Sequence, residues 1–364
     1  MQQRGRPPPE GRPGRPTVRH TVATTHEYEV VIVGAGPAGM TAAMYAGRSM
    51  LKSIVLEAGE PGGELLKTEV IEDYPGFEHV LGRDLAEKFA SHAKKFGCEF
   101  REFTKVSSVR RRDDGMFETT ATPVWDEEDV HVFVSPTVIV TAGGTPVYLN
   151  VPGEAEYAGK GVSYCAICDG AFFKGQTIAV IGGGDAAVEE ADFLTRYAEK
   201  VYLVHRRDEL RASKILQKRI FENPKVEPVW NKAVDEIVGE LPEGVKGLRL
   251  RDTITGEPST LDVTGAFVFI GFRPNTGVID MHYEHDDMGY VKTDVNMMTS
   301  VPGLFAAGDL RSQLVRQVTT AVGDATTAAI AAEKLLKALE DTHGDIEAAA
   351  REPQVVVGTG GYAV

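Results

Sequence analysis

The sequence has little cysteine, little tryptophan and no long hydrophobic run. Its 364 residues include three cysteines and two tryptophans, and no apolar stretch approaches the roughly 18 residues that span a membrane. So few cysteines exclude a secreted fold stapled by several disulfides, so we expect a cytoplasmic protein that uses any cysteine pair functionally. Basic residues are not in excess either. The net charge of −14 argues against nucleic acid or an anionic membrane as the main partner.

The length allows two domains between two tails. Hydrophobic residues make up 42% and charged residues 25% of the chain, which is ordinary for a globular protein. Residues 1–26 are rich in proline, arginine and glycine without hydrophobic periodicity, so we expect a disordered tail and not a signal peptide. Residues 342–364 are polar and then rich in glycine, and we expect a second tail there.

The most informative stretch is Cys165-Ala-Ile-Cys168, with Asp169 directly after it. Two cysteines at this spacing can close and reopen a disulfide, and an adjacent acid can exchange protons with the thiolate that forms. Half a zinc site is one alternative, but Cys98 is the only other cysteine and no His-x3-His completes four ligands. A structural disulfide in so short a loop would remove little chain entropy. We therefore favour a redox pair and no metal, and expect Cys98 to be a small buried side chain.

A first dinucleotide-binding pattern begins with an apolar strand over residues 29–33. It continues with Gly34-Ala-Gly36-Pro-Ala38-Gly39, a helix over 40–48 and a strand over 53–57 that ends in Glu57. The glycines allow a tight turn that brings a pyrophosphate to the helix N-terminus, and Glu57 can bind ribose hydroxyls. The complete order of strand, turn, helix, strand and acid indicates a nucleotide with free ribose hydroxyls.

The pattern recurs after the cysteine pair. A strand over 177–181 leads into Gly182-Gly-Gly184-Asp185-Ala-Ala187, a helix over 188–197 and a strand over 200–204. Alignment of the two units on their first glycines puts His205 where Glu57 stands in the first unit.

Arginines replace the missing acid of the second unit. Arg206 and Arg207 follow His205, and Arg211 lies four residues further on. A carboxylate would repel a 2′-phosphate, whereas guanidinium groups bind phosphate oxygens in a fork. We therefore assign this unit to NADP(H); a solvated basic face is the alternative.

Other segments complete the organisation. Residues 81–96 predict an amphipathic helix and residues 100–140 a β-meander. Two apolar strands, over 137–140 and 265–270, each end in glycine before a proline, which suits a two-strand hinge to an inserted domain. Near the end, a strand closes on Gly308-Asp309, and Arg316-Gln317-Val318 precede an alanine-rich helix over 319–339. The acid can bind a ribityl hydroxyl while the helix N-terminus faces a cofactor.

Together these motifs resemble the low-molecular-weight thioredoxin reductases, which are pyridine nucleotide flavoproteins. The resemblance runs from Tyr28 to about Leu339. It is carried by the two glycine fingerprints, the Cys165–Asp169 stretch, the His205–Arg211 cluster, Gly271-x2-Pro274-Asn275-Thr276, and Gly308-Asp309 with Arg316-Gln317.

The resemblance implies an α/β fold of two Rossmann-like, three-layer ββα nucleotide-binding domains. We expect a discontinuous FAD domain over 27–145 and 272–341, with an NADPH domain that carries the redox pair inserted over 146–271. The cofactors implied are FAD and NADPH, and the partners are a thioredoxin-like protein and a second copy of the chain. The inserted domain is expected to rotate between two orientations.

The resemblance also implies roles for individual residues. Cys168 should face the flavin and form a thiolate, Cys165 should attack the disulfide of thioredoxin, and Asp169 should protonate the leaving thiolate. The residues expected to bind FAD are Gly34, Gly36, Ala38, Gly39, Glu57, Gly63, Glu64, Gly308, Asp309, Arg316, Gln317 and Val318. Those expected to bind NADPH are Gly182, Gly184, Asp185, Ala187, His205, Arg206, Arg207 and Arg211.

Three positions depart from the family pattern. Glu64 stands where glutamine is usual, Ala186 where serine is common and Ala325 where glycine is common. A negative charge from Glu64 near the flavin would disfavour its reduced anionic form.

Four other functions share this scaffold or its cysteine pair. A reductase of peroxiredoxin normally carries an additional thioredoxin-like module, which a 26-residue tail cannot supply. A small-molecule dithiol oxidase and an enzyme fed by ferredoxin or a deazaflavin are the second and third alternatives, and the arginine cluster counts against both. A redox-sensing binding module without catalysis is the fourth, and two complete nucleotide units argue against it.

Overall fold

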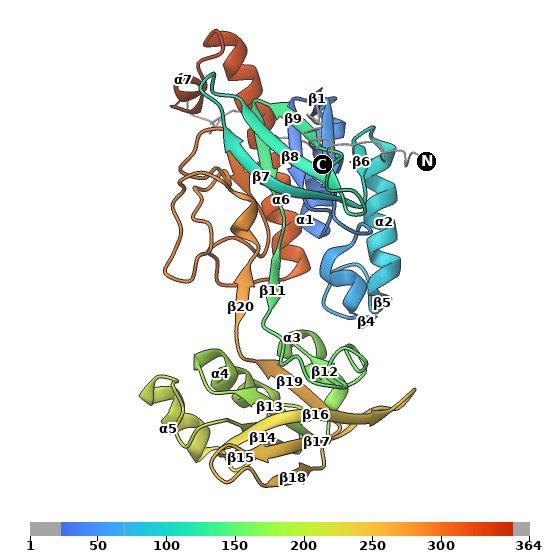
Figure 1. Cartoon of the computed structure of the whole chain (residues 1–364), viewed down its shortest axis with the longest axis vertical. Coiled ribbons are helices and arrows are strands. Elements are labelled where there is room, and N and C mark those ends of the chain that lie inside the picture. The colour runs from blue at the N-terminus through green and yellow to red at the C-terminus, as the bar shows by residue number, and fades with distance from the viewer. Residues whose placement is uncertain (1–22, 69, 352–364) are drawn as a thin grey trace, which may run out of the picture.

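The structure is a computed structural model that describes residues 23–68 and 70–351. Two layered bodies of unequal size are joined by the strands β11 and β20 (Figure 1). Within the described ranges, no helix combines the length and apolarity needed to cross a membrane. The same residues contain no group of three or more His, Cys, Asp or Glu side chains arranged to hold a metal ion.

A parallel sheet forms the centre of the larger body. Its five strands run in the order β21-β10-β2-β3-β6, with bounds β2 (Val30–Val33), β3 (Ser53–Leu56), β6 (Glu99–Arg101), β10 (Thr137–Val140) and β21 (Leu304–Ala306). All residues of β2, β3, β10 and β21 are buried. Such short, buried and mostly apolar strands are typical of a parallel sheet that is covered on both faces.

Alternate side chains of β2 point into two different cores, because successive residues of a strand face opposite sides of the sheet. Val30 and Ile32 pack with the helices, whereas Val31 and Val33 pack with an antiparallel sheet of order β1-β9-β8-β7. The helices are α1 (Pro37–Arg48), α2 (Gly82–Lys95) and α6 (Val318–Asp341), and the outer strands are β1 (Thr24–Glu27), β7 (Thr104–Arg111), β8 (Phe117–Pro123) and β9 (His131–Ser135).

The smaller body repeats this three-layer arrangement. Ile178 and Val180 of its central strand pack with helices, and Ala179 and Ile181 with a second antiparallel sheet. The central sheet has the order β12-β19-β13-β14-β15, and the bounds are β12 (Val162–Ser163), β13 (Thr177–Gly182), β14 (Lys200–Val204), β15 (Val226–Val229) and β19 (Gly265–Phe269). The covering elements are α3 (Ala166–Asp169), α4 (Asp185–Leu194), α5 (Lys214–Glu222), β16 (Lys232–Glu240), β17 (Gly244–Asp252) and β18 (Pro258–Leu261). The predicted fold class is confirmed.

The chain passes between the bodies twice. β11 (Gly144–Pro146) leads into the smaller body and β20 (Phe272–Pro274) leads back, and the two strands pair antiparallel. The remaining short elements are β4 (Val70–Ile71), β5 (Val80–Leu81), and the 3₁₀ turns η1 (Gly63–Lys67), η2 (Gly170–Phe173) and η3 (Thr276–Val278).

Regular elements extend further toward both ends of the chain than the sequence suggested. Residues 24–26 were expected to be disordered, but they belong to β1, which pairs with β9. Residues 346–351 were expected in the C-terminal tail, but they form α7 (Ile346–Arg351). Both elements are stabilised by distant partners that local sequence patterns do not reveal. The tail predictions for residues 1–22 and 352–364 lie outside the described residues.

The helix α7 packs on the larger body through two apolar side chains and one ion pair. Ile346 and Ala349 are 6% and 0% exposed, and Glu347 lies 2.9 Å from the guanidinium of Arg111. Because a buried isoleucine loses both transfer free energy and packing on truncation, Ile346→Ala should lower the free energy of unfolding by about 2 kcal/mol. Denaturant unfolding measures this, with Glu347→Gln as the control that removes the exposed ion pair and should change it by less than about 1 kcal/mol. Equal stability of Ile346→Ala and the parent protein would contradict the observed packing.

Candidate active site

Cys165 and Cys168 are joined by a disulfide at the start of the short helix α3. Cys165 is the N-cap residue of this helix, and its Sγ accepts a hydrogen bond of 3.2 Å from the backbone N–H of Cys168. Cys98 is free and buried, as the sequence suggested. Burial raises the pKa of its thiol to about 11, so that Cys98 does not supply a thiolate at neutral pH.

Asp169 directly follows Cys168 and is the last residue of α3. Burial raises the pKa of its carboxyl, and the charge of Asp73 raises it further, against the opposing effect of Ser163. Asp73 belongs to the larger body, so the cysteine pair lies at the junction of the two bodies. A carboxyl that keeps its proton to higher pH is suited to protonate a thiolate.

The N-terminus of α6 in the larger body faces the disulfide. Gln317 is the N-cap residue of α6, and its side-chain nitrogen lies 3.9 Å from the Sγ atoms of both Cys165 and Cys168. Thr320 completes the cap by accepting a 3.0 Å hydrogen bond from the backbone N–H of Gln317. The sulfur pair therefore faces amide donors and the positive end of a 24-residue helix.

The first glycine turn leaves no room for larger residues. Gly34 has φ = +103°, and a Cβ on Gly39 would lie 1.8 Å from the carbonyl oxygen of Gly34. A Cβ on Gly36 would meet nothing within 4 Å, so the turn is open on that side. Glu57 reaches back to this turn, where its carboxylate accepts hydrogen bonds from the N–H groups of Ala35 at 2.6 Å and Gly59 at 2.9 Å.

Two further glycines pack onto this turn. A Cβ on Gly63 would lie 3.1 Å from the Cα of Gly36, and one on Gly308 would lie 3.2 Å from the Cβ of Ala38. The fold thus brings the predicted FAD residues of three distant segments around the N-terminus of α1. Glu64, next to Gly63, forms an ion pair of 2.8 Å with Lys67.

A half-buried acid, Asp309, follows Gly308. Burial raises the pKa of Asp309 to about 6, and the charges of Glu64 and Asp324 contribute to the increase, while Arg316 opposes it. Arg316 stacks its guanidinium 4.0 Å from the ring centre of Tyr290, and its Nε is buried without a hydrogen-bond partner among the described residues. A polar ligand with hydroxyl and carbonyl groups would satisfy a half-buried carboxyl and a buried N–H that lacks a partner.

The second glycine turn is bounded by His205. A Cβ on Gly183 would lie 2.2 Å from the imidazole of His205, and one on Gly184 would meet nothing within 4 Å. Burial lowers the pKa of His205, and the nearby arginines lower it further, so the ring is neutral. The carboxylate of Asp185 is partly engaged within the protein, because it accepts a hydrogen bond of 2.6 Å from the N–H of Ser213. A Cβ on Gly182 would lie 2.5 Å from the Cβ of Ala187.

The three arginines after His205 are exposed and lie beside this turn. The N–H of Arg211 donates a hydrogen bond of 2.7 Å to the carbonyl oxygen of Gly183, which fixes the loop over the glycines. Among the described residues, no carboxylate forms an ion pair with Arg206, Arg207 or Arg211. Three free guanidinium groups at this position fit a phosphate.

The structure does not bring the two glycine turns into one site, since one lies in each body (Figure 1).

Sequence reasoning missed the buried ion pair of 2.7 Å between Arg311 and Asp324. The other carboxylate oxygen of Asp324 accepts a hydrogen bond from the N–H of Gly308. An acid on the apolar face of the alanine-rich helix was the available signal. It also missed Tyr290, because nothing in a loop sequence predicts a cation–π partner.

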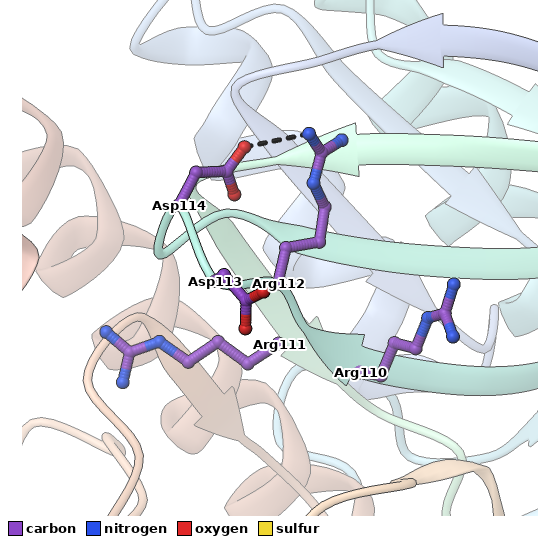
Figure 2. A pocket seen from close by; sticks show the side chains of 5 residues that line it. All are labelled: Arg110, Arg111, Arg112, Asp113 and Asp114. Atoms are coloured by element: carbon purple, nitrogen blue, oxygen red, sulfur yellow. Dashed lines mark ion pairs between the residues drawn. The ribbon is translucent and has the colours of Figure 1, made fainter.

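A surface hollow of about 460 Å³ lies on the hairpin between β7 and β8, beside α7. Figure 2 shows its lining of Arg110, Arg111, Arg112, Asp113 and Asp114. Each arginine has a carboxylate partner: Glu118 at 2.5 Å, Glu347 at 2.9 Å and Asp114 at 2.8 Å, respectively. These pairs neutralise the arginines, so we do not assign an anion site here.

Comparison with known proteins identifies the class. Residues 28–325 match the pyridine nucleotide-disulphide oxidoreductase family. Thioredoxin reductase of Bacillus subtilis is 45% identical over 315 residues, which cover 86% of this chain and 96% of that protein. The crystal structure of thioredoxin reductase from Streptococcus pyogenes is 42% identical and matches with a TM-score of 0.78, covering 85% of this chain and 98% of that one.

A second solved structure is nearly as similar in sequence but less similar in shape. Lactococcus lactis thioredoxin reductase, described as in the FR conformation, is 41% identical over 84% of this chain and 98% of that one, with a TM-score of 0.56. The chain belongs to the pyridine nucleotide-disulphide oxidoreductase family and, within it, to the thioredoxin reductases. Its cofactors are FAD and NADPH. The half-buried Asp309, the Nε of Arg316 that lacks a partner among the described residues, and the free arginines fit these groups.

The raised pKa of Asp309 predicts that ionisation of this carboxyl lowers the free energy of unfolding of the flavin-free protein as the pH rises. A folded pKa of about 6, above the ordinary 3.8, means that the native state holds the proton more tightly. The destabilisation by ionised Asp309 is therefore absent below about pH 4 and complete above about pH 7. Asp309→Asn should raise the free energy of unfolding by about 1–3 kcal/mol at pH 7.5 and by much less at pH 4.

Denaturant unfolding of the flavin-free protein at both pH values measures this effect. Asp262→Asn, at an exposed aspartate, serves as the control for the loss of one negative charge. An equal increase in the free energy of unfolding at both pH values would contradict the raised pKa of Asp309.

Proposed function

We propose that this protein transfers two electrons from NADPH through FAD to the Cys165–Cys168 disulfide, and that the resulting dithiol reduces thioredoxin. The observation that carries this proposal is the position of the disulfide between two dinucleotide units, 3.9 Å from the side-chain nitrogen of Gln317 at the N-terminus of α6. The overall reaction balances, because NADPH, one proton and oxidised thioredoxin give NADP⁺ and reduced thioredoxin.

The proposed FAD domain comprises residues 27–145 and 272–341. Its glycine turn would receive the pyrophosphate at the N-terminus of α1, with Glu57 on the adenosine ribose. Asp309 would accept hydrogen bonds from ribityl hydroxyls, and the N-terminus of α6 would lie against the isoalloxazine. The residues that would hold FAD are Gly34, Gly36, Ala38, Gly39, Glu57, Gly63, Glu64, Gly308, Asp309, Arg316, Gln317 and Val318.

The proposed NADPH domain comprises residues 146–271. The pyrophosphate of NADPH would lie at the N-terminus of α4, and the three arginines would hold its 2′-phosphate. The residues that would hold NADPH are Gly182, Gly184, Asp185, Ala187, His205, Arg206, Arg207 and Arg211. The free guanidinium groups favour NADPH over ferredoxin, a deazaflavin or a dithiol substrate as the electron source.

When bound by the residues named above, FAD would supply the two-electron chemistry that connects NADPH to the Cys165–Cys168 disulfide. In the reduced pair, the Cys168 N–H that donates to Cys165 Sγ would stabilise a thiolate on Cys165. That thiolate attacks the disulfide of thioredoxin, forms a mixed disulfide and releases a thiolate, which takes a proton from Asp169. Cys168 then attacks the Cys165 sulfur, which re-forms the internal disulfide and releases reduced thioredoxin.

Two exposed apolar side chains flank the disulfide and would contact thioredoxin. Ile167 lies between the cysteines and is 53% exposed, and Phe172 in η2 is 42% exposed. Exposed apolar groups next to a reactive bond are typical of a protein-docking surface.

The smaller body must reorient during this cycle, because the disulfide faces α6 and is not open to a protein partner there. The antiparallel pair β11·β20 is a narrow connection that permits such a rotation. The two relatives of 42% and 41% identity, with TM-scores of 0.78 and 0.56, support a chain whose bodies adopt more than one arrangement.

We further propose a homodimer in the cytoplasm. Leu314 and Val315 precede α6 with 98% and 43% of their surface exposed, which leaves an apolar surface for a second copy. NADPH and the thiols that it keeps reduced belong to the reducing compartment of a cell. Light scattering of the purified protein tests the dimer, and a monomer at micromolar concentration would contradict it.

Removal of the flavin-facing sulfur tests the electron path. Cys168→Ser should reduce NADPH-dependent thioredoxin reduction by at least about 10³-fold, because no internal disulfide can form or re-form. NADPH should still bleach the flavin absorbance of the variant. Cys98→Ala, at the buried free cysteine, should leave turnover unchanged. Thioredoxin reduction by Cys168→Ser at the parental rate would place the redox site elsewhere.

Loss of one phosphate-binding arginine tests the nucleotide assignment. Arg207→Ala should raise the KM for NADPH about 10- to 100-fold, because a charge-assisted hydrogen bond to phosphate is lost, without changing the KM for NADH. Steady-state kinetics with both nucleotides measures this, and Arg219→Ala on the exposed face of α5 is the charge-matched control. Equal effects on NADPH and NADH would remove the case for a 2′-phosphate site.

A further inference from the structure

The two nucleotide units form the same backbone hydrogen bonds at and after Glu57 in the first unit and His205 in the second. In the first unit the N–H of Thr104 donates to the carbonyl oxygen of Glu57 at 2.7 Å, and that of Phe103 to Gly59 at 3.3 Å. In the second unit the N–H of Lys232 donates to His205 at 3.0 Å, and that of Asn231 to Arg207 at 3.2 Å. Phe103 and Asn231 are therefore structurally equivalent, and each closes the turn beside its ribose position.

Both equivalent residues have left-handed backbone conformations, with φ = +53° for Phe103 and φ = +54° for Asn231. Asparagine tolerates this region, whereas a bulky side chain there is an outlier that surrounding structure must enforce. The first unit thus keeps an aromatic ring where the backbone favours asparagine. Residues held in such conformations cluster at ligand sites.

A second aromatic side chain lies against this ring. Trp125 follows β8 in a turn closed by a 3.1 Å hydrogen bond from the N–H of Asp126 to the carbonyl oxygen of Pro123. The N–H of Val124, in the same turn, donates to the carbonyl oxygen of Phe103 at 2.9 Å. The ring centres of Phe103 and Trp125 lie 6.3 Å apart, and the two side chains are 39% and 73% exposed. In the second unit the equivalent turn follows β17, and its Thr253 N–H donates to the carbonyl oxygen of Asn231 at 2.8 Å. This turn carries the aliphatic Ile254, which is 75% exposed.

We propose that Phe103 and Trp125 form a stacking surface for the adenine ring of FAD, an inference that rests on the proposed function. Phe103 is hydrogen-bonded to the loop that follows Glu57, so a base attached to a ribose held by Glu57 would reach the aromatic pair. Stacking buries part of both exposed rings against a flat π-face. The pair is then a specificity determinant for FAD over FMN, which has no adenine.

Flavin binding by the flavin-free, full-length protein tests this proposal. The probes are FAD and FMN, with dissociation constants measured from quenching of flavin fluorescence. Phe103→Asn introduces the residue that the second unit uses, and Trp125→Ala removes the outer ring. Each should raise the Kd for FAD about tenfold, as expected for the loss of one base-stacking contact, and leave the Kd for FMN unchanged. FAD should also quench the fluorescence of Trp125 in a Trp230→Phe background.

Two controls separate stacking from folding. Phe103→Asn removes the backbone outlier, so its melting temperature without flavin should equal or exceed that of the parent protein. Ile254→Ala, in the equivalent turn of the other unit, should leave the Kd for FAD unchanged. A parental Kd for FAD in both aromatic variants would overturn the proposal, as would an equal increase for FMN. An increase in the KM for thioredoxin with a parental Kd for FAD would also overturn it, because it would indicate a protein-docking surface.

The outcomes also distinguish this inference from the proposed function. A parent protein that binds FAD and reduces thioredoxin, with variants that bind FAD equally well, would remove only the stacking surface. A parent protein that binds no FAD would remove both.

Discussion

The chemistry of this protein depends on one contact between its two bodies. Gln317 caps α6 in the larger body, and its side-chain nitrogen lies 3.9 Å from both sulfurs of a disulfide that belongs to the smaller body. The same arrangement brings Asp73 near enough to Asp169 to raise the pKa of its carboxyl. In the proposed electron path, the disulfide beside α6 is followed directly in the chain by an acid, Asp169.

Side chains near the connection support this arrangement without a covalent link. Lys67 lies 3.4 Å from the hydroxyl of Tyr148, whose ring packs edge-on against Tyr164 with ring centres 5.4 Å apart. The Tyr164 hydroxyl donates to the buried Glu154 at 2.9 Å. The connection itself is a two-stranded ribbon, which would permit the rotation that the proposed cycle requires.

Much of the site was predictable because it depends on local rules. The glycine turns require small residues at fixed spacing, and the acid or the arginines follow their strands directly, so Glu57 and Arg207 could be proposed as nucleotide-binding residues from sequence alone. The cysteine pair was found for the same reason. The three-layer fold was expected only from the family resemblance, and the alternation of Val30 to Val33 between two cores is seen in the structure.

The rest depends on distant partners. The strand β1 exists because β9 offers it hydrogen bonds, and α7 exists because Ile346 is buried against the larger body. The approach of Gln317 to Cys165 joins residues 152 positions apart. Arg311 and Asp324 form a buried ion pair, and Asp324 also accepts the N–H of Gly308. In the sequence they look like an ordinary polar residue of a loop and one of a helix. Long-range burial, not propensity, determines each of these features.

NADPH oxidation by the purified yellow protein, with and without oxidised thioredoxin and with NADH alongside, tests the central claim most directly. The account predicts rapid oxidation that requires both NADPH and thioredoxin and is slow with NADH. Flavin that stays oxidised in the presence of NADPH would contradict it, because the arginine cluster would then bind something other than the electron donor.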